Sequence, residues 1–156
     1  MAVPERAPGA FEVALAALRR KERATTELAA WLEKRGFGAG EVEAAIARLT
    51  EVGELDDERF ARRYAEDKRE LCGWGAKRIG QALRSRGIDT AVVEAALEVD
   101  SHGAQVGRAS ELLARRGQPL GGELERSRAF GFLARRGYPH EVAYEAIRLA
   151  DQRKQG

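Results

Sequence analysis

The chain has 156 residues, of which 44% are apolar and 33% are charged, and it contains only four prolines. This composition excludes a disordered polypeptide and favours a folded, helix-rich protein. The net charge of +2 is too small for a protein that coats DNA non-specifically, and its sign excludes an acidic mimic of DNA. The positive charge is concentrated in the last third, because residues 101–156 carry ten basic and six acidic side chains.

The sequence also indicates the compartment. Cys72 is the only cysteine, so no intrachain disulfide can form and a reducing environment is expected. No apolar run approaches the roughly 18 to 20 residues that a membrane span requires, and residues 1–10 lack the features of a signal peptide. We therefore predict a cytoplasmic protein without membrane contact, in which residues 1–10 form a flexible N-terminal arm.

Three glycines mark an internal repeat. Gly36, Gly87 and Gly137 lie 51 and 50 residues apart, and their neighbours recur at fixed offsets. The recurring neighbours are a leucine four positions before, an arginine one before and a large apolar residue one after: Leu32, Leu83, Leu133, Arg35, Arg86, Arg136, Phe37, Ile88 and Tyr138. Because glycine just beyond a helix ends it in the left-handed conformation, each copy predicts a helix that stops at its glycine and a second helix after a short turn.

The first repeat, residues 11–55, begins with a helical stretch at roughly Phe11 to Arg23. Apolar residues at helical spacing predict two more helices, the second of which starts near Gly40. These apolar residues are Leu28, Trp31, Leu32, Val42, Ala45, Ile46 and Leu49.

The second repeat, residues 56–100, has its first helix at roughly Asp57 to Leu71, and Asp89-Thr90 is favoured chemistry for the start of its last helix. Between the first two helices, Gly73-Trp74-Gly75 predicts a tight turn with Trp74 over the core. One apolar face per helix is formed by Phe60, Tyr64, Ile79, Ala82, Leu83, Val92, Val93, Ala96 and Leu97.

The third repeat, residues 101–156, has a first helix at roughly Gly103 to Arg116, a loop of its own at residues 118–122, and a final helix that starts at Pro139. A unit of about 50 residues is marginal alone, so neighbouring units are expected to stack. The predicted fold is all-α, with three tandem three-helix repeats stacked in an elongated, curved array. We expect the core to include Trp31, Phe60, Tyr64, Ile79, Leu83 and Leu133.

No metal or phosphate-binding motif is complete. His140 and Glu141 open like a zinc-protease motif, but Tyr144 stands where the second histidine is needed. His102 is the only other histidine, so no zinc ligand set is present, and we interpret His140 as a surface residue in a first helical turn. The segment Gly73-Trp74-Gly75 lacks the phosphate-loop pattern and the preceding strand.

Carboxylates are plentiful, but nearly all lie on predicted helices within reach of an arginine. Glu58 with Arg62 and Arg63 with Asp67 are examples of pairs four residues apart. No pair suggests a general acid and base, and no nucleophile has a neighbouring base. We predict no catalytic, metal-binding or cofactor-binding residue.

The second repeat carries a family signature. It reads Asp56-Asp57-Glu58-Arg59-Phe60-Ala61-Arg62-Arg63-Tyr64, then Gly73-Trp74-Gly75-Ala76-Lys77-Arg78-Ile79, then Leu83 and Arg86-Gly87-Ile88. This pattern resembles the signature of RecX proteins, which has an acidic pair, a Phe-Ala step, a glycine-x-glycine turn and a basic–glycine–apolar helix end. The resemblance covers roughly Phe11 to Ala150, with departures mainly in the third repeat. Its structural signature residues are Phe60, Tyr64, Gly73, Trp74, Gly75, Ile79, Leu83 and Gly87.

The resemblance implies a monomeric, non-catalytic regulator of homologous recombination, DNA repair and the SOS response. Such a protein binds the RecA–single-stranded-DNA filament in its helical groove, inhibits ATP hydrolysis and strand exchange, and has at most weak direct DNA binding. Basic residues suit contacts with carboxylate or phosphate groups. The candidate contact residues are Lys77, Arg78 and Arg84 of the second repeat and Arg115, Arg116, Arg126, Arg128 and Arg135 of the third.

Two other functions stay open on the residues alone. Three-helix units resemble helix-turn-helix modules, which bind DNA directly, although Glu41 and Glu43 at the start of a candidate recognition helix would repel phosphates. A generic adaptor array would share the fold but not the signature. The arginines before the repeat glycines, Arg35, Arg86 and Arg136, we interpret chiefly as partners of the helix dipole.

Overall fold

The computed structural model describes residues 7–155, and this part of the chain contains helices and no strand. Nine helices follow one another in the described range: α1 (Ala10–Arg20), α2 (Thr25–Lys34), α3 (Ala39–Glu51), α4 (Asp57–Cys72), α5 (Ala76–Ser85), α6 (Thr90–Glu98), α7 (His102–Arg116), α8 (Glu123–Arg135) and α9 (His140–Gln155). The predicted all-α fold is confirmed. None of these helices combines the length with the apolar character that spanning a bilayer demands. Of the predicted arm, residues 1–6 lie outside the described residues, and α1 already includes Ala10, which is buried.

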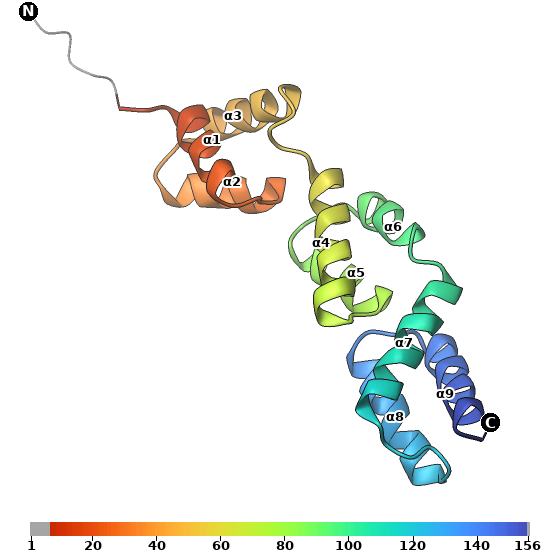
Figure 1. The fold of residues 1–156 in the computed structure, drawn as a ribbon. Helices are drawn as coiled ribbons and strands as arrows, with labels where there is room; N and C mark the ends of the chain where they lie inside the picture. Colours follow the sequence, from red (N-terminus) through yellow and green to blue (C-terminus); the bar gives the residue numbers. More distant parts are fainter. Residues whose placement is uncertain (1–6, 156) are drawn as a thin grey trace, which may run out of the picture.

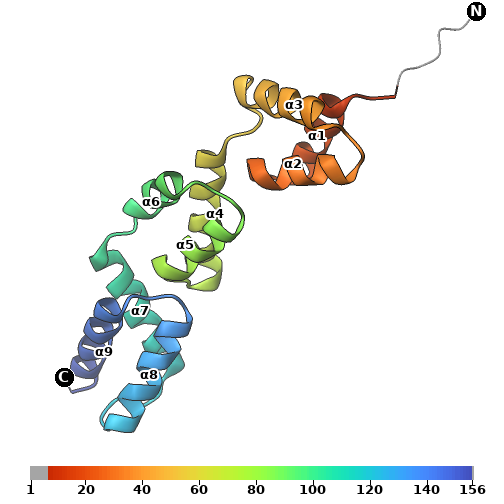
Figure 2. The same cartoon turned by 180° about the vertical axis from the view of Figure 1, so that it is seen from behind.

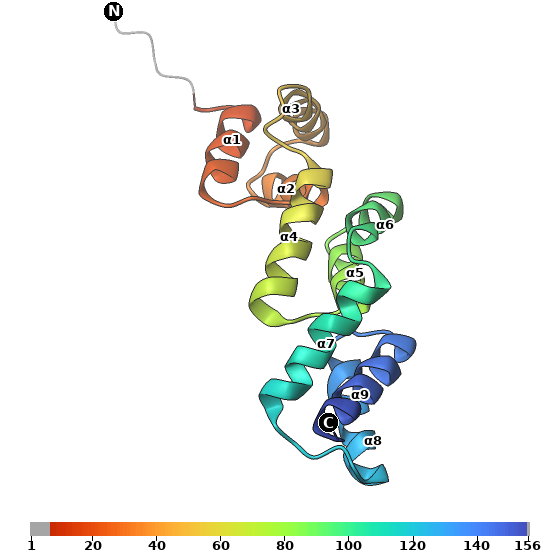
Figure 3. The ribbon, with the colours of Figure 1, turned by 45° about the vertical axis from the view of Figure 1, so that its right-hand side comes forward.

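The helices group into unit 1 (α1–α3), unit 2 (α4–α6) and unit 3 (α7–α9). Within each unit the third helix packs against both the first and the second. The units follow one another in an extended row, with α1 and α9 at opposite ends (Figures 1 and 2). Unit 2 also lies between units 1 and 3 when the molecule is seen from another side (Figure 3). The tandem, elongated arrangement that the repeat predicts is therefore confirmed.

The repeat glycines end the middle helix of each unit. Gly36, Gly87 and Gly137 have φ angles of 94°, 82° and 95°, in the left-handed region that favours glycine. The residue after each glycine donates its amide to the carbonyl of the recurring leucine, in the pairs Phe37–Leu32, Ile88–Leu83 and Tyr138–Leu133. This hydrogen bond belongs to the helix-ending motif that requires a left-handed residue. It explains why glycine and leucine recur together.

The starts of α9 and α8 in unit 3 have features of their own. The helix α9 begins at His140, one residue later than predicted, and the carbonyl of Pro139 accepts the amide of Ala143. At the start of α8, the amide of Gly122 donates to Oε2 of Glu125 at 2.9 Å, so this helix caps itself.

Each unit has its own apolar core. Four of the predicted core residues are buried, namely Phe60, Ile79, Leu83 and Leu133. Trp31 and Tyr64 pack against the cores of units 1 and 2, but they are only half-buried. The reason is that basic groups cover their rings: Arg35 lies 4.1 Å from the ring centre of Trp31, and Arg86 lies 5.0 Å from that of Tyr64.

The ion pairs also differ from the predicted ones. Among the described residues, Glu58 forms no ion pair with Arg62, and Arg63 forms none with Asp67. Arg63 instead lies 3.7 Å from Glu22 in the connection between α1 and α2. Charged groups of α4 therefore join unit 2 to unit 1. The sequence alone instead predicts helix faces in contact with solvent for these groups.

Candidate partner interface at the joint between units 2 and 3

The joint between units 1 and 2 forms where the α1–α2 connection meets unit 2. Ala24 packs into the core of unit 2, and the amide of Thr25 donates to Oδ1 of Asp57 at 2.8 Å. The Thr26 hydroxyl donates to the carbonyl of Gly87 at 3.3 Å. A Cβ added at Gly87 would lie 2.9 Å from Thr26. Two features therefore require glycine at this position, the left-handed helix end and the close approach of Thr26.

The joint between units 2 and 3 repeats this arrangement with backbone hydrogen bonds. The amide of Gly75 donates to the carbonyl of Arg136 at 2.8 Å, and the amide of Lys77 donates to that of Gly137 at 3.0 Å. The first turn of α5 thus supplies N–H groups that no intrahelical carbonyl can accept, and the end of α8 supplies the carbonyls. A Cβ at Gly137 would collide with Arg78, and one at Gly75 would lie 2.5 Å from the Gly137 oxygen. The signature glycine Gly75 and the repeat glycine Gly137 therefore let the units touch.

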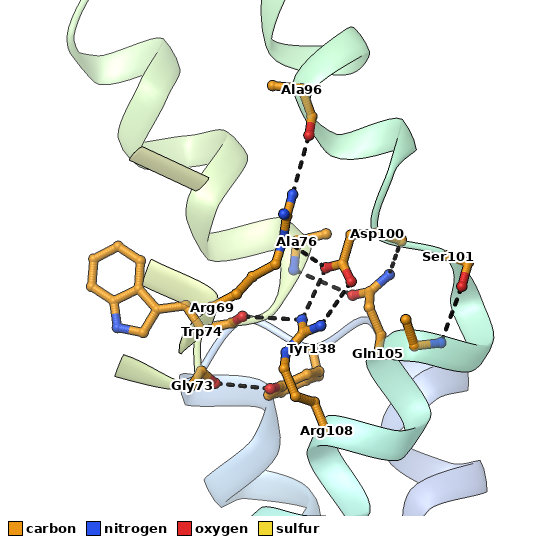
Figure 4. Close-up of polar contacts among 11 residues, drawn as sticks. Arg69, Gly73, Trp74, Ala76, Ala96, Asp100, Ser101, Gln105, Arg108 and Tyr138 are labelled. Atoms are coloured by element: carbon orange, nitrogen blue, oxygen red, sulfur yellow. Dashed lines mark hydrogen bonds and ion pairs between the residues drawn. The ribbon is translucent and has the colours of Figure 1, made fainter. Parts of the chain in front are cut away.

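A buried carboxylate lies beside these contacts (Figure 4). Asp100, whose side chain is 1% exposed, accepts two hydrogen bonds from Arg108, at 2.7 and 2.9 Å, and forms an ion pair with Arg69 at 3.4 Å. Burial alone would lower the pKa of Arg108, but the hydrogen bond and charge of Asp100 outweigh it, so the net pKa is raised. The guanidinium stays charged, and one carboxylate holds α4 and α7 together.

Uncharged polar groups complete the same joint. Gln105 accepts the amide of Ala76 on Oε1 at 3.2 Å, and the Tyr138 hydroxyl donates to the carbonyl of Gly73 at 2.8 Å. Burial raises the pKa of Tyr138 above its ordinary value of 10.0, against a smaller lowering effect of Arg108. The hydroxyl is therefore a stable donor at neutral pH, and unit 3 is fixed on unit 2 by several independent bonds.

A basic groove of about 300 Å³ crosses this joint. Its walls come from α5, α8, the α8–α9 connection and the start of α9. The lining residues are Lys77, Arg78, Gln81, Ala134, Arg135, Gly137, Tyr138 and His140. No acidic side chain is among them, so the groove is suited to carboxylate or phosphate groups. Arg78 is held in place there, because its guanidinium lies 4.0 Å from the ring centre of Trp74 and donates to the carbonyl of Arg135 at 3.3 Å.

The structure thus brings three predicted contact residues together, Lys77, Arg78 and Arg135, although their stretches lie far apart in sequence. Arg84 lies in the last turn of α5, away from this groove lining. Lys77, Arg78 and Arg135, together with the rest of the groove lining, define the candidate partner interface.

The remaining predicted contact residues do not form one patch. Arg115 lines a separate pocket of about 420 Å³ together with Arg69 and Arg108. Arg116 lies over the ring of Phe132, with 4.3 Å to its centre. Arg126 donates to the carbonyls of residues 120 and 121, so it fixes the loop at residues 118–122. Arg128 is exposed.

Several residues at the joint escaped sequence reasoning, chiefly Asp100, Gln105, Arg108 and Tyr138. A single aspartate before a helix start is typical of a cap, and an arginine on a helix is typical of a solvated face, so neither carried a signal. Only the recurrence of a large apolar residue after each repeat glycine pointed to Tyr138. In the described part of the chain, no group of three or more His, Cys, Asp or Glu side chains is arranged to hold a metal ion.

Known proteins with similar sequences support one assignment. The family models for the first and second three-helix domains of RecX match residues 10–49 and 56–97. The chain is 34% identical to "Regulatory protein RecX" of Mycolicibacterium vanbaalenii over 96% of its own length and 88% of that protein. It is 36% identical to the protein of the same name from Thermus thermophilus, over 94% of the chain and 96% of that protein.

A solved structure supports the fold. The crystal structure of RecX from Lactobacillus salivarius aligns with a TM-score of 0.83, over 92% of this chain and 95% of that one, at 21% identity. A second crystal structure, "regulatory protein RecX", aligns with a TM-score of 0.76 over 89% of this chain and 70% of that one. At this identity the likeness concerns the fold alone, whereas the sequence relatives span most of the chain. The chain therefore belongs to the RecX family of regulatory proteins.

Proposed function

We propose that this protein binds a RecA-type recombinase filament on single-stranded DNA and inhibits its ATP hydrolysis and strand exchange. The observation that carries the proposal is the basic groove across a firmly bonded joint, in an elongated member of the RecX family. The protein acts as a binding partner without an active site of its own. We place this function in the cytoplasm.

The extended row of units supports binding along a filament. A filament repeats the same protomer surface many times, so an array with several contact surfaces gains avidity from weak single contacts. The bonded joints fix the spacing of those surfaces before binding, which lowers the entropy lost on association.

The groove chemistry supports a polar contact of defined geometry. Arg78 is stacked on Trp74 and bonded to the Arg135 carbonyl, so part of its freedom is lost before any partner arrives. Lys77 and Arg135 have exposed side chains beside it. Three cationic groups in one concave surface are suited to an acidic segment of the recombinase or to a phosphate of the bound strand.

The test is a titration into a RecA ATPase assay on single-stranded DNA at moderate salt, with naked-DNA binding measured in the same buffer. We expect inhibition by the wild type, and weaker inhibition by a Lys77→Glu/Arg135→Glu variant. The matched control, Arg62→Glu/Arg153→Glu, makes the same charge change at exposed positions outside the groove. Unchanged ATP turnover at saturating wild-type protein would refute the proposal.

Direct binding to duplex DNA is the competing function. It receives little support from unit 1, where Glu41 and Glu43 are exposed at the start of α3. Binding of naked DNA should fall steeply as salt rises, because it depends on counterion release. Tight, sequence-selective duplex binding without any effect on the recombinase would favour this alternative.

A further inference from the structure

Each unit places one arginine in the same position. It stands directly before the repeat glycine and lies over an aromatic ring of its own unit. The three pairs and their distances from guanidinium carbon to ring centre are Arg35 over Trp31 at 4.1 Å, Arg86 over Tyr64 at 5.0 Å and Arg136 over Phe132 at 5.0 Å. The ring orients the guanidinium and leaves its N–H edge for another acceptor.

In units 2 and 3 that acceptor belongs to the preceding unit. Arg86 donates to Oε1 of Glu27, in the first turn of α2, at 3.2 Å. Arg136 donates to the carbonyl of Cys72, at the end of α4, at 2.7 Å. These arginines therefore bind across the joints, in addition to any interaction with the helix dipole. For Arg35, no hydrogen bond or ion pair of the guanidinium is present among residues 7–155.

The turns at the repeat glycines also make contacts with the preceding unit in units 2 and 3 but not in unit 1, as far as the described residues go. Gly87 contacts Thr26 and Gly137 contacts Arg78, but the space around Gly36 is open, with nothing within 4 Å of a Cβ built there. The carbonyls of Arg136 and Gly137 accept amides from α5. Among the described residues, no hydrogen bond reaches the corresponding carbonyls of residues 35 and 36. Unit 1 thus presents the same docking half that units 2 and 3 use, and no residue of the range 7–155 occupies it.

A pocket of about 380 Å³ lies at this end of unit 1. Its lining includes three arginines, Arg20, Arg23 and Arg35, against one carboxylate, Glu12. Arg23 lies 4.9 Å from the ring centre of Trp31, and its buried Nη1 has no hydrogen-bond partner among the described residues. A pocket with excess positive charge and an unpaired donor fits an acidic occupant.

We propose that this outer face of unit 1, formed by Arg23, Trp31, Arg35 and the Gly36 turn, docks the acidic first turn of a helix on a protein partner. The two joints suggest the chemistry: at the joint between units 1 and 2 the Glu27 carboxylate meets Arg86, and at the joint between units 2 and 3 helix-start amides meet the turn carbonyls. A nucleic-acid backbone offers oxygens to the arginines but no N–H groups to those carbonyls. The face therefore fits a protein better than a nucleic acid.

The identification of the partner as the recombinase rests on the proposed function. In a binding assay with the RecA–single-stranded-DNA filament, we expect Arg35→Glu to weaken binding about tenfold, because an oriented arginine–carboxylate contact is lost. Arg35→Lys should give an intermediate loss, since it keeps the charge without the planar fork. The matched control is Arg62→Glu, an exposed arginine of α4, which should change the affinity less than about twofold.

Naked single-stranded DNA is the second arm of this assay. Arg35→Glu and Arg62→Glu should affect its binding equally. If Arg35→Glu weakens DNA binding as much as filament binding, the occupant is nucleic acid and the proposal is overturned. Equal effects of the two variants on the filament would overturn it as well.

A third arm keeps this inference separate from the proposed function. In a Trp74→Phe background, Trp31 is the only tryptophan, so its fluorescence reports on the pocket. Poly-L-glutamate is the probe, and we expect a saturable emission change that Arg35→Glu abolishes and Arg62→Glu keeps. A filament that fails to bind the wild type refutes the proposed function alone, whereas an unresponsive Trp31 refutes the docking site.

Discussion

Replacing Asp100 with asparagine should destabilise the protein strongly. The carboxylate is 1% exposed and is the shared partner of two arginines, Arg69 and Arg108, whose side chains are only 14% and 22% exposed. The substitution keeps the volume but removes the negative charge, which leaves two guanidinium groups close together without compensation. Breaking a buried ion pair from one side costs about 3–5 kcal/mol, whereas a whole domain is stable by about 5–15 kcal/mol.

The measurement is urea unfolding followed by circular dichroism at neutral pH. Asp67→Asn on α4 is the control, because Asp67 is exposed and should change the stability by less than about 0.5 kcal/mol. Adding Arg108→Met to Asp100→Asn removes one uncompensated charge, so the double variant should recover part of the loss. A cost below about 1 kcal/mol for Asp100→Asn would mean that solvent or rearrangement neutralises the cluster, and the account of the joint would fail.

Three further outcomes are expected. Gly36→Ala should lower the free energy of unfolding by about 1–2 kcal/mol, the strain of a left-handed alanine. Gly137→Ala should cost about 1–3 kcal/mol more, because its Cβ would also collide with Arg78. Equal losses for the two variants in urea unfolding would contradict the tight joint. Leu83→Ala should cost about 2–5 kcal/mol, since Leu83 is fully buried, and a calorimetric loss well under 1 kcal/mol would show that its face is wrongly assigned. Because the pKa of Tyr138 is raised in the folded protein, its contribution to stability is complete below pH 10 and is lost as the pH rises through the folded-state pKa. Above pH 10, the free energy of unfolding of the wild type should therefore fall more steeply than that of Tyr138→Phe. Parallel curves for the two proteins would contradict the burial of the Tyr138 hydroxyl.

The fold was predictable because its signals are local. Gly36, Gly87 and Gly137 determine helix ends through their own backbone, and the leucines four residues earlier receive the helix-ending hydrogen bond. Both features therefore recur at fixed offsets in the chain. The half-burial of Trp31 escaped prediction because an arginine above a ring leaves no trace in apolar periodicity.

The joints were not predictable, because their partners are far apart in the chain. Arg86 meets Glu27 from 59 residues away and Arg136 meets Cys72 from 64 residues away, and each single residue is typical of an ordinary helix surface. The segment boundaries at residues 10, 55 and 100 and the partner contacts of the basic residues stay predictions. The binding experiments above address those contacts.

The bond between Gly122 and Glu125 gives the start of α8 a hydrogen-bond partner within its own unit. In unit 1 the first amide of the middle helix, that of Thr25, donates to Asp57 of the following unit, and in unit 2 the amide of Gly75 donates to Arg136. In unit 3, where the middle helix α8 is longer than α2 and α5, the amide directly before the helix, that of Gly122, donates to a side chain of its own helix. A partner that docked at this end of the row would therefore meet a Gly122 amide that already has an acceptor, whereas the amides of Thr25 and Gly75 take theirs from the next unit.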